Sequence, residues 1–330
     1  MIPILFESTA TDFTTNGIGR LADVISCKVT EERNGIYECE FEYPIDGKRY
    51  EDIIEGRIIV VKHDDTDDLQ PFDIYGHSAP IDGIVTFYAH HISYRLGEIT
   101  VKPFSASSCT EALQKLKQNS IYANPFTFWT DKSVNADYVI DQPVNLKEYL
   151  GGTEGSILDI FGTGEYEWDK FTVKFHLNRG TNTDVQIRYG KNLADLQDEE
   201  DWSGCYTAVV PYWFGQDSET DEDVLVTLDE WYVTSGQSTY GGREIIVPMD
   251  LSGEWQDPPT KAQLRQTAVS RLMLGEGWMP SKSVKVDFVH LWQTEEYAEY
   301  APLQRVKLCD TVTVIYPNDK PGKGKIICSE

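Results

Sequence analysis

Three acidic residues that alternate with aromatic residues are the best candidates for acid–base chemistry in this chain. Glu165, Glu167 and Asp169 flank Tyr166 and Trp168, and a pair of carboxylates could supply the acid and the base of glycosidic cleavage. In a β-strand, however, alternate side chains share one face, so the pattern also fits the wet face of a hairpin whose other face is buried. We favour the hairpin face and assign no catalytic residue here.

Histidine and cysteine residues form the next set of possible ligands. His90 and His91 are adjacent, and in the strand expected from Ile84 onward they point to opposite faces, so they cannot readily bind one metal ion. The closest cysteines, Cys27 and Cys39, form no CxxC pair. We therefore predict reduced thiols and no metal site. The cysteines stand at positions 27, 39, 109, 205, 309 and 328.

Three short segments resemble ligand-binding loops without meeting their requirements. Residues 17–22 (GIGRLA) fit a dinucleotide fingerprint by letter, but they follow no buried strand and precede no long helix. Residues 322–325 (GKGK) lack the Ser or Thr and the upstream glycine of a phosphate loop. Residues 217–223 (DSETDED) lack the central glycine of a calcium loop. We predict no cofactor, and no protease signature is found.

Composition is typical of a folded, strongly acidic protein. The 330 residues include 29 basic and 54 acidic side chains, for a net charge of −25, and aromatic residues make up 12%. A polyanion would be repelled, which excludes specific nucleic-acid binding. So many aromatic residues exclude a disordered acidic tail. We expect neither a signal peptide nor a membrane-spanning helix, and the length favours two or more domains.

The elements that would position these residues begin with a hairpin. Residues 24–32 and 36–43 pair best through a three-residue loop, 33–35, with Gly35 in the left-handed conformation, because only this register makes one face consistently apolar. Val29 then pairs with Cys39. Cys27 and Cys39 become diagonal neighbours about 7 Å apart, a separation poorly suited to a disulfide. The opposite face carries Glu38, Glu40 and Glu42.

A second hairpin and several helix starts follow. Residues 164–175 predict a hairpin with loop 169–170, pairing Trp168 with Phe171 and Tyr166 with Val173. Capping boxes predict the starts of three helices: Ser108 with Glu111, Ser156 with Asp159, and Thr260 with Gln263. Further strands are expected at 58–62, 71–77, 84–92, 185–189, 206–214, 224–234, 243–249, 284–292 and 308–316.

These elements predict an α+β fold that is mainly β. We expect two antiparallel β-barrel or sandwich domains, at residues 1–100 and 163–255, interleaved with two smaller helix-containing α+β domains, at 101–162 and 256–330. The last of these would pack on the second. Residues 324–330 form an apolar, strand-like segment, so we expect the native chain to continue beyond it.

Five sequence blocks, in this order, resemble the phage and prophage tail-associated proteins known as the prophage endopeptidase tail family. The blocks are residues 31–37 (EERNGIY) with 43–44, 89–94 (AHHISY), 155–159 (GSILD) with 164–166 (GEY), 188–193 (RYGKNL) and 308–312 (LCDTV). The residues that carry the resemblance are Asn34, Gly35, His90, Ser156, Asp159, Arg188, Tyr189, Gly190, Lys191, Asn192 and Asp310.

This resemblance implies a baseplate hub at the tail tip of a siphophage virion, related in architecture to contractile-tail hubs. Three chains with two barrel-like domains each would form a pseudo-sixfold ring, adapting the sixfold tail tube to a threefold tip around the DNA channel. The implied partners are the homotrimer, a distal tail protein ring, the tape-measure protein and C-terminal receptor-binding or lytic modules. The family's endopeptidase activity would lie in such a C-terminal extension, so no enzyme is expected here. Synthesis would take place in the cytoplasm of the bacterial host.

The net charge suggests a further role in such a hub. Carboxylates that line the channel would repel DNA phosphates and keep the genome from adhering. The candidate lumen-facing residues are Glu38, Glu40, Glu42, Glu165 and Glu167. Three alternatives remain: the charge only keeps the protein soluble, the chain is a peptidoglycan-degrading tail-associated lysin, or it is a carbohydrate-binding module that uses exposed Trp and Tyr.

Overall fold

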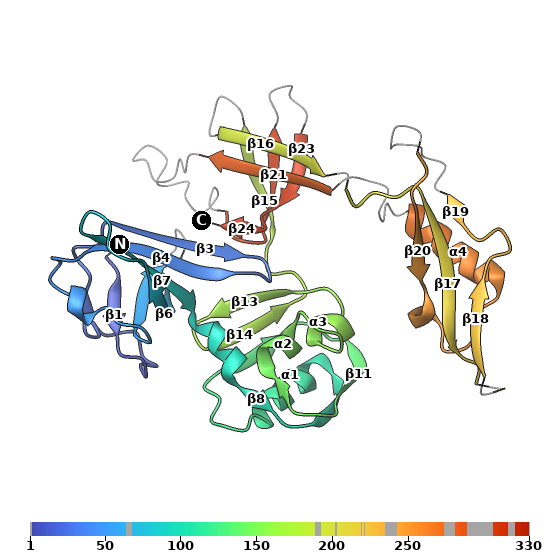
Figure 1. The fold of residues 1–330 in the computed structure, drawn as a ribbon, viewed down its shortest axis with the longest axis horizontal. Helices are drawn as coiled ribbons and strands as arrows, with labels where there is room; N and C mark the ends of the chain where they lie inside the picture. The colour runs from blue at the N-terminus through green and yellow to red at the C-terminus, as the bar shows by residue number, and fades with distance from the viewer. Residues whose placement is uncertain are drawn as a thin grey trace. The chain divides into compact units, whose positions relative to one another are not determined.

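A computed structural model describes most of the chain in two compact units. Unit 1 comprises residues 1–192 and 290–330, and unit 2 comprises residues 193–289; both are drawn in Figure 1. The described residues are 2–63, 68–188, 193–201, 203–218, 220, 222–234, 243–273, 281–288, 306–315 and 321–329. The four predicted domain ranges do not map one to one onto these units, and they stay a prediction.

Unit 1 contains an antiparallel sheet of eight strands in the order β2-β1-β5-β6-β7-β4-β3-β24. The strands are β1 (Ile4–Phe6), β2 (Gly19–Arg20), β3 (Ser26–Glu32), β4 (Tyr37–Pro44), β5 (Ile58–Lys62), β6 (Leu69–His77), β7 (Ile84–His91) and β24 (Cys328–Ser329). Two 3-10 helices accompany them, η1 (Tyr50–Asp52) and η2 (Ile92–Glu98). No pairing among the described residues joins β2 to β24, so this sheet is open. Of the two predicted alternatives, barrel or sandwich, the closed barrel is therefore wrong.

The β3–β4 hairpin has the predicted register. Cys27 lies opposite Phe41 and Val29 opposite Cys39, and the loop consists of residues 33–35. The left-handed residue, however, is Asn34, with φ of 55°, so the assignment to Gly35 is wrong. Asn tolerates this conformation because its short polar side chain can form local hydrogen bonds.

The pleat of β4 separates a buried face from a solvent face, as predicted. Its apolar side chains are buried, whereas Glu38 and Glu42 are half-buried and Glu40 is exposed. The buried face forms one hydrophobic cluster with the other central strands, and partly buried Trp168 joins it from elsewhere in unit 1. Every second residue of β4 is therefore committed to the core: Tyr37, Cys39, Phe41 and Tyr43.

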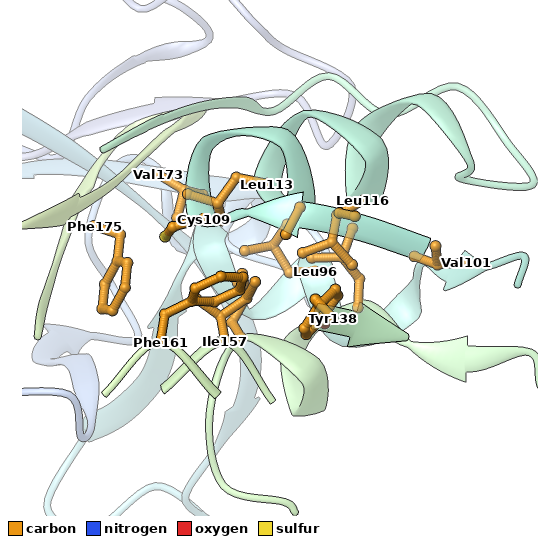
Figure 2. Packing of buried hydrophobic residues seen from close by; sticks show 14 of the residues in the cluster. Leu96, Val101, Cys109, Leu113, Leu116, Tyr138, Ile157, Phe161, Val173 and Phe175 are labelled. Atoms are coloured by element: carbon orange, nitrogen blue, oxygen red, sulfur yellow. The ribbon is translucent and has the colours of Figure 1, made fainter. Parts of the chain in front are cut away.

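Residues 99–179 build a second hydrophobic core in unit 1. Its elements are β8 (Thr100–Val101), β9 (Phe104–Ser108), α1 (Cys109–Gln118), β10 (Thr127–Thr130), β11 (Asn135–Ile140), β12 (Val144–Asn145), α2 (Leu146–Leu150), α3 (Ile157–Ile160), β13 (Glu165–Asp169) and β14 (Thr172–His176). Helix α1 buries the predicted stripe: Cys109, Leu113 and Leu116 belong to one hydrophobic cluster with Tyr138 and Phe161, and Figure 2 shows Cys109 beside Val173 and Leu116 beside Tyr138.

Two predicted capping boxes are confirmed in this region. Ser108 Oγ accepts the N–H of Glu111 at 3.3 Å, and the Glu111 carboxylate in turn accepts the N–H of Ser107 at 2.8 Å. Ser156 Oγ accepts the N–H of Asp159 at 3.4 Å. Each cap satisfies an N–H group that the helix itself leaves without a partner.

The β13–β14 hairpin is shifted from the predicted register by two residues. Tyr166 lies opposite Phe175 and Trp168 opposite Val173, so the loop consists of residues 170–171 rather than 169–170. Phe171 does not face Trp168. It packs instead against the rings of Phe13 and Phe126, with centroids 6.2 and 5.3 Å away. The packing of Phe171 against these two rings, outside the hairpin, therefore sets the position of the loop. Because the register shifts by two residues, the remaining side chains of both strands keep their predicted faces.

A small sheet completes unit 1. It consists of β15 (Asn182–Arg188), β22 (Thr311–Ile315) and β23 (Pro321–Lys325), in the order β15-β22-β23. Strands β15 and β22 are parallel, whereas β22 and β23 are antiparallel. A strand from the middle of the chain thus shares one sheet with two strands near its C-terminal end.

In the part of unit 2 that the structure describes, strands combine with one α-helix. The strands β16 (Leu193–Asp201) and β21 (Ser281–Phe288) pair, and β17 (Ala208–Gln216) pairs with β18 (Asp223–Thr227), β19 (Val233–Thr234) and β20 (Ile246–Asp250). A 3-10 turn, η3 (Ser252–Glu254), precedes helix α4 (Lys261–Met273). Leu264, Ala268 and Leu272 pack on β17 around Trp213, and the predicted Thr260–Gln263 cap is confirmed. The strand predicted at 224–234 is instead two strands, β18 and β19.

Candidate interaction surface

The solvent face of the unit 1 sheet gathers acidic and aromatic residues from neighbouring strands. Strand β4 places Glu38 opposite His90 and Glu40 opposite Tyr88 of β7. On its other side, Glu40 lies opposite Lys28 of β3. Because residues directly opposite in an antiparallel pair lie on the same face, these side chains form one continuous surface.

Aromatic rings extend this surface across β6, β7 and η2. Tyr75 stacks on His90 with centroids 5.0 Å apart, and His90 stacks on Tyr94 at 4.8 Å. Tyr88 lies 6.4 Å from Tyr75. At the end of the row, Lys147 Nζ of α2 is 3.3 Å from the centroid of the Tyr94 ring, a cation–π contact. We call the surface of Glu38, Glu40, Tyr75, Tyr88, His90 and Tyr94 the aromatic–acidic face.

The aromatic–acidic face remains accessible to a partner. Tyr75 keeps 51% of its surface exposed, and a shallow cavity of about 120 Å³ is lined in part by Lys28, Glu38, Glu40 and Tyr88. Large aromatic rings with a polar rim are typical of interaction sites. The sequence did not single out Tyr75 or Lys147; the outward positions of Tyr88 and His90 in a predicted strand were the available signal.

Burial keeps the histidine of this face uncharged at neutral pH. Desolvation lowers the pKa of His90, which therefore stays neutral. It also raises the pKa of Tyr75, and the nearby carboxylate of Glu38 adds to that rise. Desolvation lowers the pKa of Lys147, against the attraction of Glu38.

His91 points to the opposite side of the sheet, as predicted for neighbours in a strand. It is fully buried, its Nδ1 lies 3.0 Å from Ser93 Oγ, and its Nε2 lies 3.3 Å from Gln70 Oε1. Burial lowers its pKa well below the usual value. The ring also stacks on Tyr37 at 4.3 Å. His91 is thus a hydrogen-bonded core residue.

The tip of the β3–β4 hairpin is fastened to β13. The Asn34 side chain donates to the Gly164 carbonyl at 2.8 Å and accepts the N–H of Tyr166 at 2.8 Å. Gly35 is favoured for a different reason: a Cβ there would lie 2.9 Å from the Cβ of Glu32. Both residues of this block therefore shape a junction inside unit 1.

A group of charged residues surrounds this junction. Arg179 Nη1 donates to Glu31 at 2.6 Å, and both side chains are largely buried. Glu165 pairs with Lys325 and, at 3.4 Å, with Arg33. Burial alone would raise the pKa of Glu165, but hydrogen bonds from Lys325 and from the Arg179 N–H outweigh it and lower the pKa. We call Glu31, Arg33, Glu165, Arg179 and Lys325 the junction ion cluster.

This arrangement bears on two of the candidate lumen-facing residues. Glu165 is only 4% exposed and its charge is compensated locally, which argues against an open acidic lining at this position. Glu167 accepts from Lys174 at 2.7 Å and lies 2.7 Å from His176 Nε2. Glu167 is half-buried, as Glu38 and Glu42 are, and only Glu40 of the five candidates is exposed. The orientation of these residues toward a channel stays a prediction.

The other residues that carry the resemblance lie apart from this face. The Asp159 carboxylate accepts the N–H of Gly155 at 2.7 Å, which completes the cap with Ser156. Buried Asp310 accepts the N–H groups of Thr181 and Lys307, each at 2.8 Å. Arg188 ends β15. Tyr189, Gly190, Lys191 and Asn192 lie outside the described residues.

Within the described ranges, no three His, Cys, Asp or Glu side chains gather closely enough to hold a metal ion. No helix in the described part of the chain is long and apolar enough to cross a membrane.

Three solved structures with a similar fold are tail proteins, two of them from prophages. Prophage tail protein gp18 from Listeria monocytogenes EGD-e matches with a TM-score of 0.59, at 15% identity, over 99% of this chain and 89% of its own. A tail protein from Neisseria meningitidis MC58 gives 0.58 at 9% identity over 99% and 90%. The 43 kDa tail protein of prophage MuSo2 from Shewanella oneidensis gives 0.56 at 11% identity over 99% and 93%. This chain has the fold of prophage tail proteins.

The prophage tail fold confirms the predicted resemblance at the level of architecture. No protein-family model matches the sequence, and no curated protein matches it. At identities of 9 to 15%, the relationship lies in the path of the chain rather than in individual side chains. The aromatic–acidic face and the junction ion cluster are therefore argued only from the contacts of this chain.

Proposed function

We propose that this chain is a structural hub protein of a phage or prophage tail, located at the tail tip. The observation that carries the proposal is the fold match to three tail proteins over 99% of this chain. The arrangement of the described elements, several sheets with few helices, suits a scaffold that presents surfaces to neighbours. Its partners would be a distal tail protein ring, the tape-measure protein and C-terminal receptor-binding or lytic modules.

The proposed assembly is a homotrimer that surrounds the DNA channel. A threefold ring whose subunits each present two similar surfaces can meet a sixfold tail tube without a symmetry mismatch. The net charge of −25 and the outward acids of β4 support an acidic channel wall, because such a wall repels DNA phosphates. The candidates for that wall are Glu38, Glu40 and Glu42.

We further propose that residues 1–330 carry no hydrolase activity. A glycosidase needs a carboxylic acid whose pKa is raised, so that it is protonated when the bond breaks. Glu165, Glu167 and Asp169 are the candidate pair members, and in each the cationic hydrogen-bond donors outweigh burial and lower the pKa. All three therefore stay ionised. Incubation with purified peptidoglycan checks this: release of soluble muropeptides by the chain would refute the proposal.

One observation favours a second candidate function, carbohydrate binding. Exposed Tyr75 beside Glu38 and Glu40 offers the ring and the carboxylates that sugar recognition uses. Binding of cell-wall polysaccharide that is lost in Tyr75→Ala, while Tyr122→Ala at another exposed tyrosine retains it, would establish this function in place of a purely structural face.

The hub proposal is tested by assembly. The chain alone and the chain co-expressed with its distal tail protein are compared by native mass spectrometry. The trimer is expected in the co-expressed sample even if the isolated chain is monomeric, because association depends on concentration and partner. A co-expressed complex with one or six copies per ring would contradict it.

A further inference from the structure

Two cysteine thiols of unit 1 lie in contact. Cys27 Sγ of β3 and Cys39 Sγ of β4 are 3.6 Å apart, although the residues are diagonal rather than directly opposite neighbours. The general spacing of diagonal pairs suggested a wider separation. The side chains converge because both lie on the same face of the twisted hairpin, and both thiols are free.

The two thiols differ in accessibility. Cys27 is exposed, whereas Cys39 is buried. The other cysteines whose burial the structure describes are buried: Cys109, Cys205 and Cys309. An oxidant in solution therefore meets Cys27 first, with a second thiol already beside it. This combination of an exposed thiol and a neighbouring resolving thiol is the arrangement that redox-active pairs use.

Closing a bond requires only a small movement. The sulfur atoms must approach from 3.6 Å to about 2.05 Å. Strand β3 can supply this shift at Cys27, because its recorded pairing with β24 involves only Glu31 and Glu32. Among the residues that the structure describes, the segment around Cys27 pairs with β4 alone and so forms an edge of the sheet on its outer side.

We propose that Cys27 and Cys39 form a reversible disulfide site that reacts with small-molecule disulfides such as oxidised glutathione. The Cys27 thiolate attacks one sulfur of the oxidant, and one glutathione leaves as the thiolate. Cys39 then loses its proton and attacks Cys27 Sγ in the mixed disulfide, expelling the second glutathione. In sum, two protein thiols become one disulfide while one oxidant disulfide becomes two thiols.

The hydrogen bond between the thiols assigns the order of attack. Donation from Cys39 is the main cause that lowers the pKa of Cys27. The same bond, together with burial, raises the pKa of Cys39 well above its usual value. Cys27 is therefore the thiol that reacts first, and Cys39 resolves the intermediate.

The disulfide would staple the hairpin whose tip is fastened to β13. Oxidation is expected to slow hydrogen exchange at the amides of residues 26–29, because the edge of β3 could no longer separate from β4. The site stands on these contacts alone and does not depend on the proposed tail function.

The test is oxidation of the full chain with oxidised glutathione, followed by peptide mapping under non-reducing conditions. In the native sequence, a peptide pair linked through Cys27 and Cys39 is expected, with no glutathione retained. In Cys39→Ser, Cys27 should instead retain one glutathione, because nothing resolves the adduct. In Cys27→Ser, the buried cysteines Cys39 and Cys109 should remain unmodified.

Several outcomes would overturn the inference. A native chain that accumulates a stable glutathione adduct at Cys27 shows that Cys39 cannot reach it. A dimer linked through Cys27 of two chains shows that the resolving thiol is intermolecular, and a link from Cys27 to Cys328 shows another partner. Because the native chain alone distinguishes these results, the inference can be rejected even if a variant fails to fold.

Discussion

Strands β4 and β13 share a sequence pattern but use it in opposite ways. In both, acidic residues alternate with residues that pack inward, as Glu38 and Glu40 do around Cys39, and Glu165 and Glu167 around Tyr166. The acids of β4 stay on an accessible face with aromatic neighbours. Glu165 of β13 is buried in the junction ion cluster. Alternation thus determines which face a side chain occupies, while other segments determine whether that face is covered.

The largest expected loss of stability comes from breaking the buried ion pair of the junction ion cluster, which covers β13. Arg179→Met removes the partner of Glu31, and the two side chains are only 13% and 6% exposed. An unpaired buried carboxylate costs about 3–5 kcal/mol, and urea denaturation should show a loss of this size. The control is Arg49→Met, which breaks the exposed pair with Asp52 and should cost less than about 1 kcal/mol. Equal losses in the two variants would contradict the burial argument.

Two substitutions of Asn34 distinguish the stability that its side-chain hydrogen bonds contribute from the cost of its left-handed backbone conformation. Asn34→Gly removes both side-chain bonds to β13 but accepts the positive φ, so a loss of about 1–3 kcal/mol is expected. Asn34→Ala also strains the left-handed backbone and should lose about 1–2 kcal/mol more. Unfolding free energies of the two variants check the order. An alanine variant more stable than the glycine variant would show that φ at this position does not matter.

Lowering the pH tests whether buried His91, behind the aromatic–acidic face, makes the stability of the fold depend on pH. The pKa of His91 in the folded chain is well below its ordinary value of 6.5, so the unfolded state binds more protons below pH 6.5. Stability should therefore fall as pH drops from 6.5 toward 5, by up to about 1.4 kcal/mol per pH unit. The Glu165 carboxylate, whose pKa is lowered from 4.5, contributes only below this window. His91→Gln should flatten the slope more than His90→Gln, and equal slopes in both variants would count against the assignment.

The smallest loss of stability is expected when the acids on the solvent face of β4 are replaced. Replacing Glu38, Glu40 and Glu42 together by Gln should change the unfolding free energy by less than about 0.5 kcal/mol each, because these side chains keep solvent-facing positions. Glu165→Gln alone should cost more than the triple change. A triple variant as damaging as Glu165→Gln would mean that the β4 acids also hold the fold together.

Much of the fold followed from local patterns in the sequence. The register of β3–β4, the stripe of α1 and the caps at Ser108 and Ser156 were all correct, because each depends on residues within one or two elements. The second hairpin shifted because Phe171 packs against Phe13, a contact between distant segments. The left-handed residue was Asn34 rather than Gly35 for the same reason, since the Asn34 side chain bonds to β13.

Less of the candidate site could be predicted from local sequence patterns. His90 and the β4 acids were identified from the sequence, but Tyr75, Tyr94 and Lys147 joined them only through stacking across three elements. The junction ion cluster was missed because Glu31 and Arg179 are far apart in the chain. The register correctly predicted Cys27 and Cys39 as diagonal neighbours. The contact between their sulfur atoms could not be predicted, because a general spacing does not say how two side chains converge.

The most direct test of the hub proposal is a cryo-electron microscopy reconstruction of intact tails that contain this protein. The account predicts three copies at the tip, arranged in a ring around the DNA channel, with Glu38, Glu40 and Glu42 on the inner wall. One or six copies at this position would contradict the homotrimer. Three copies with a neutral or basic inner wall, and with the acids of β4 outside, would contradict the proposed role of the charge.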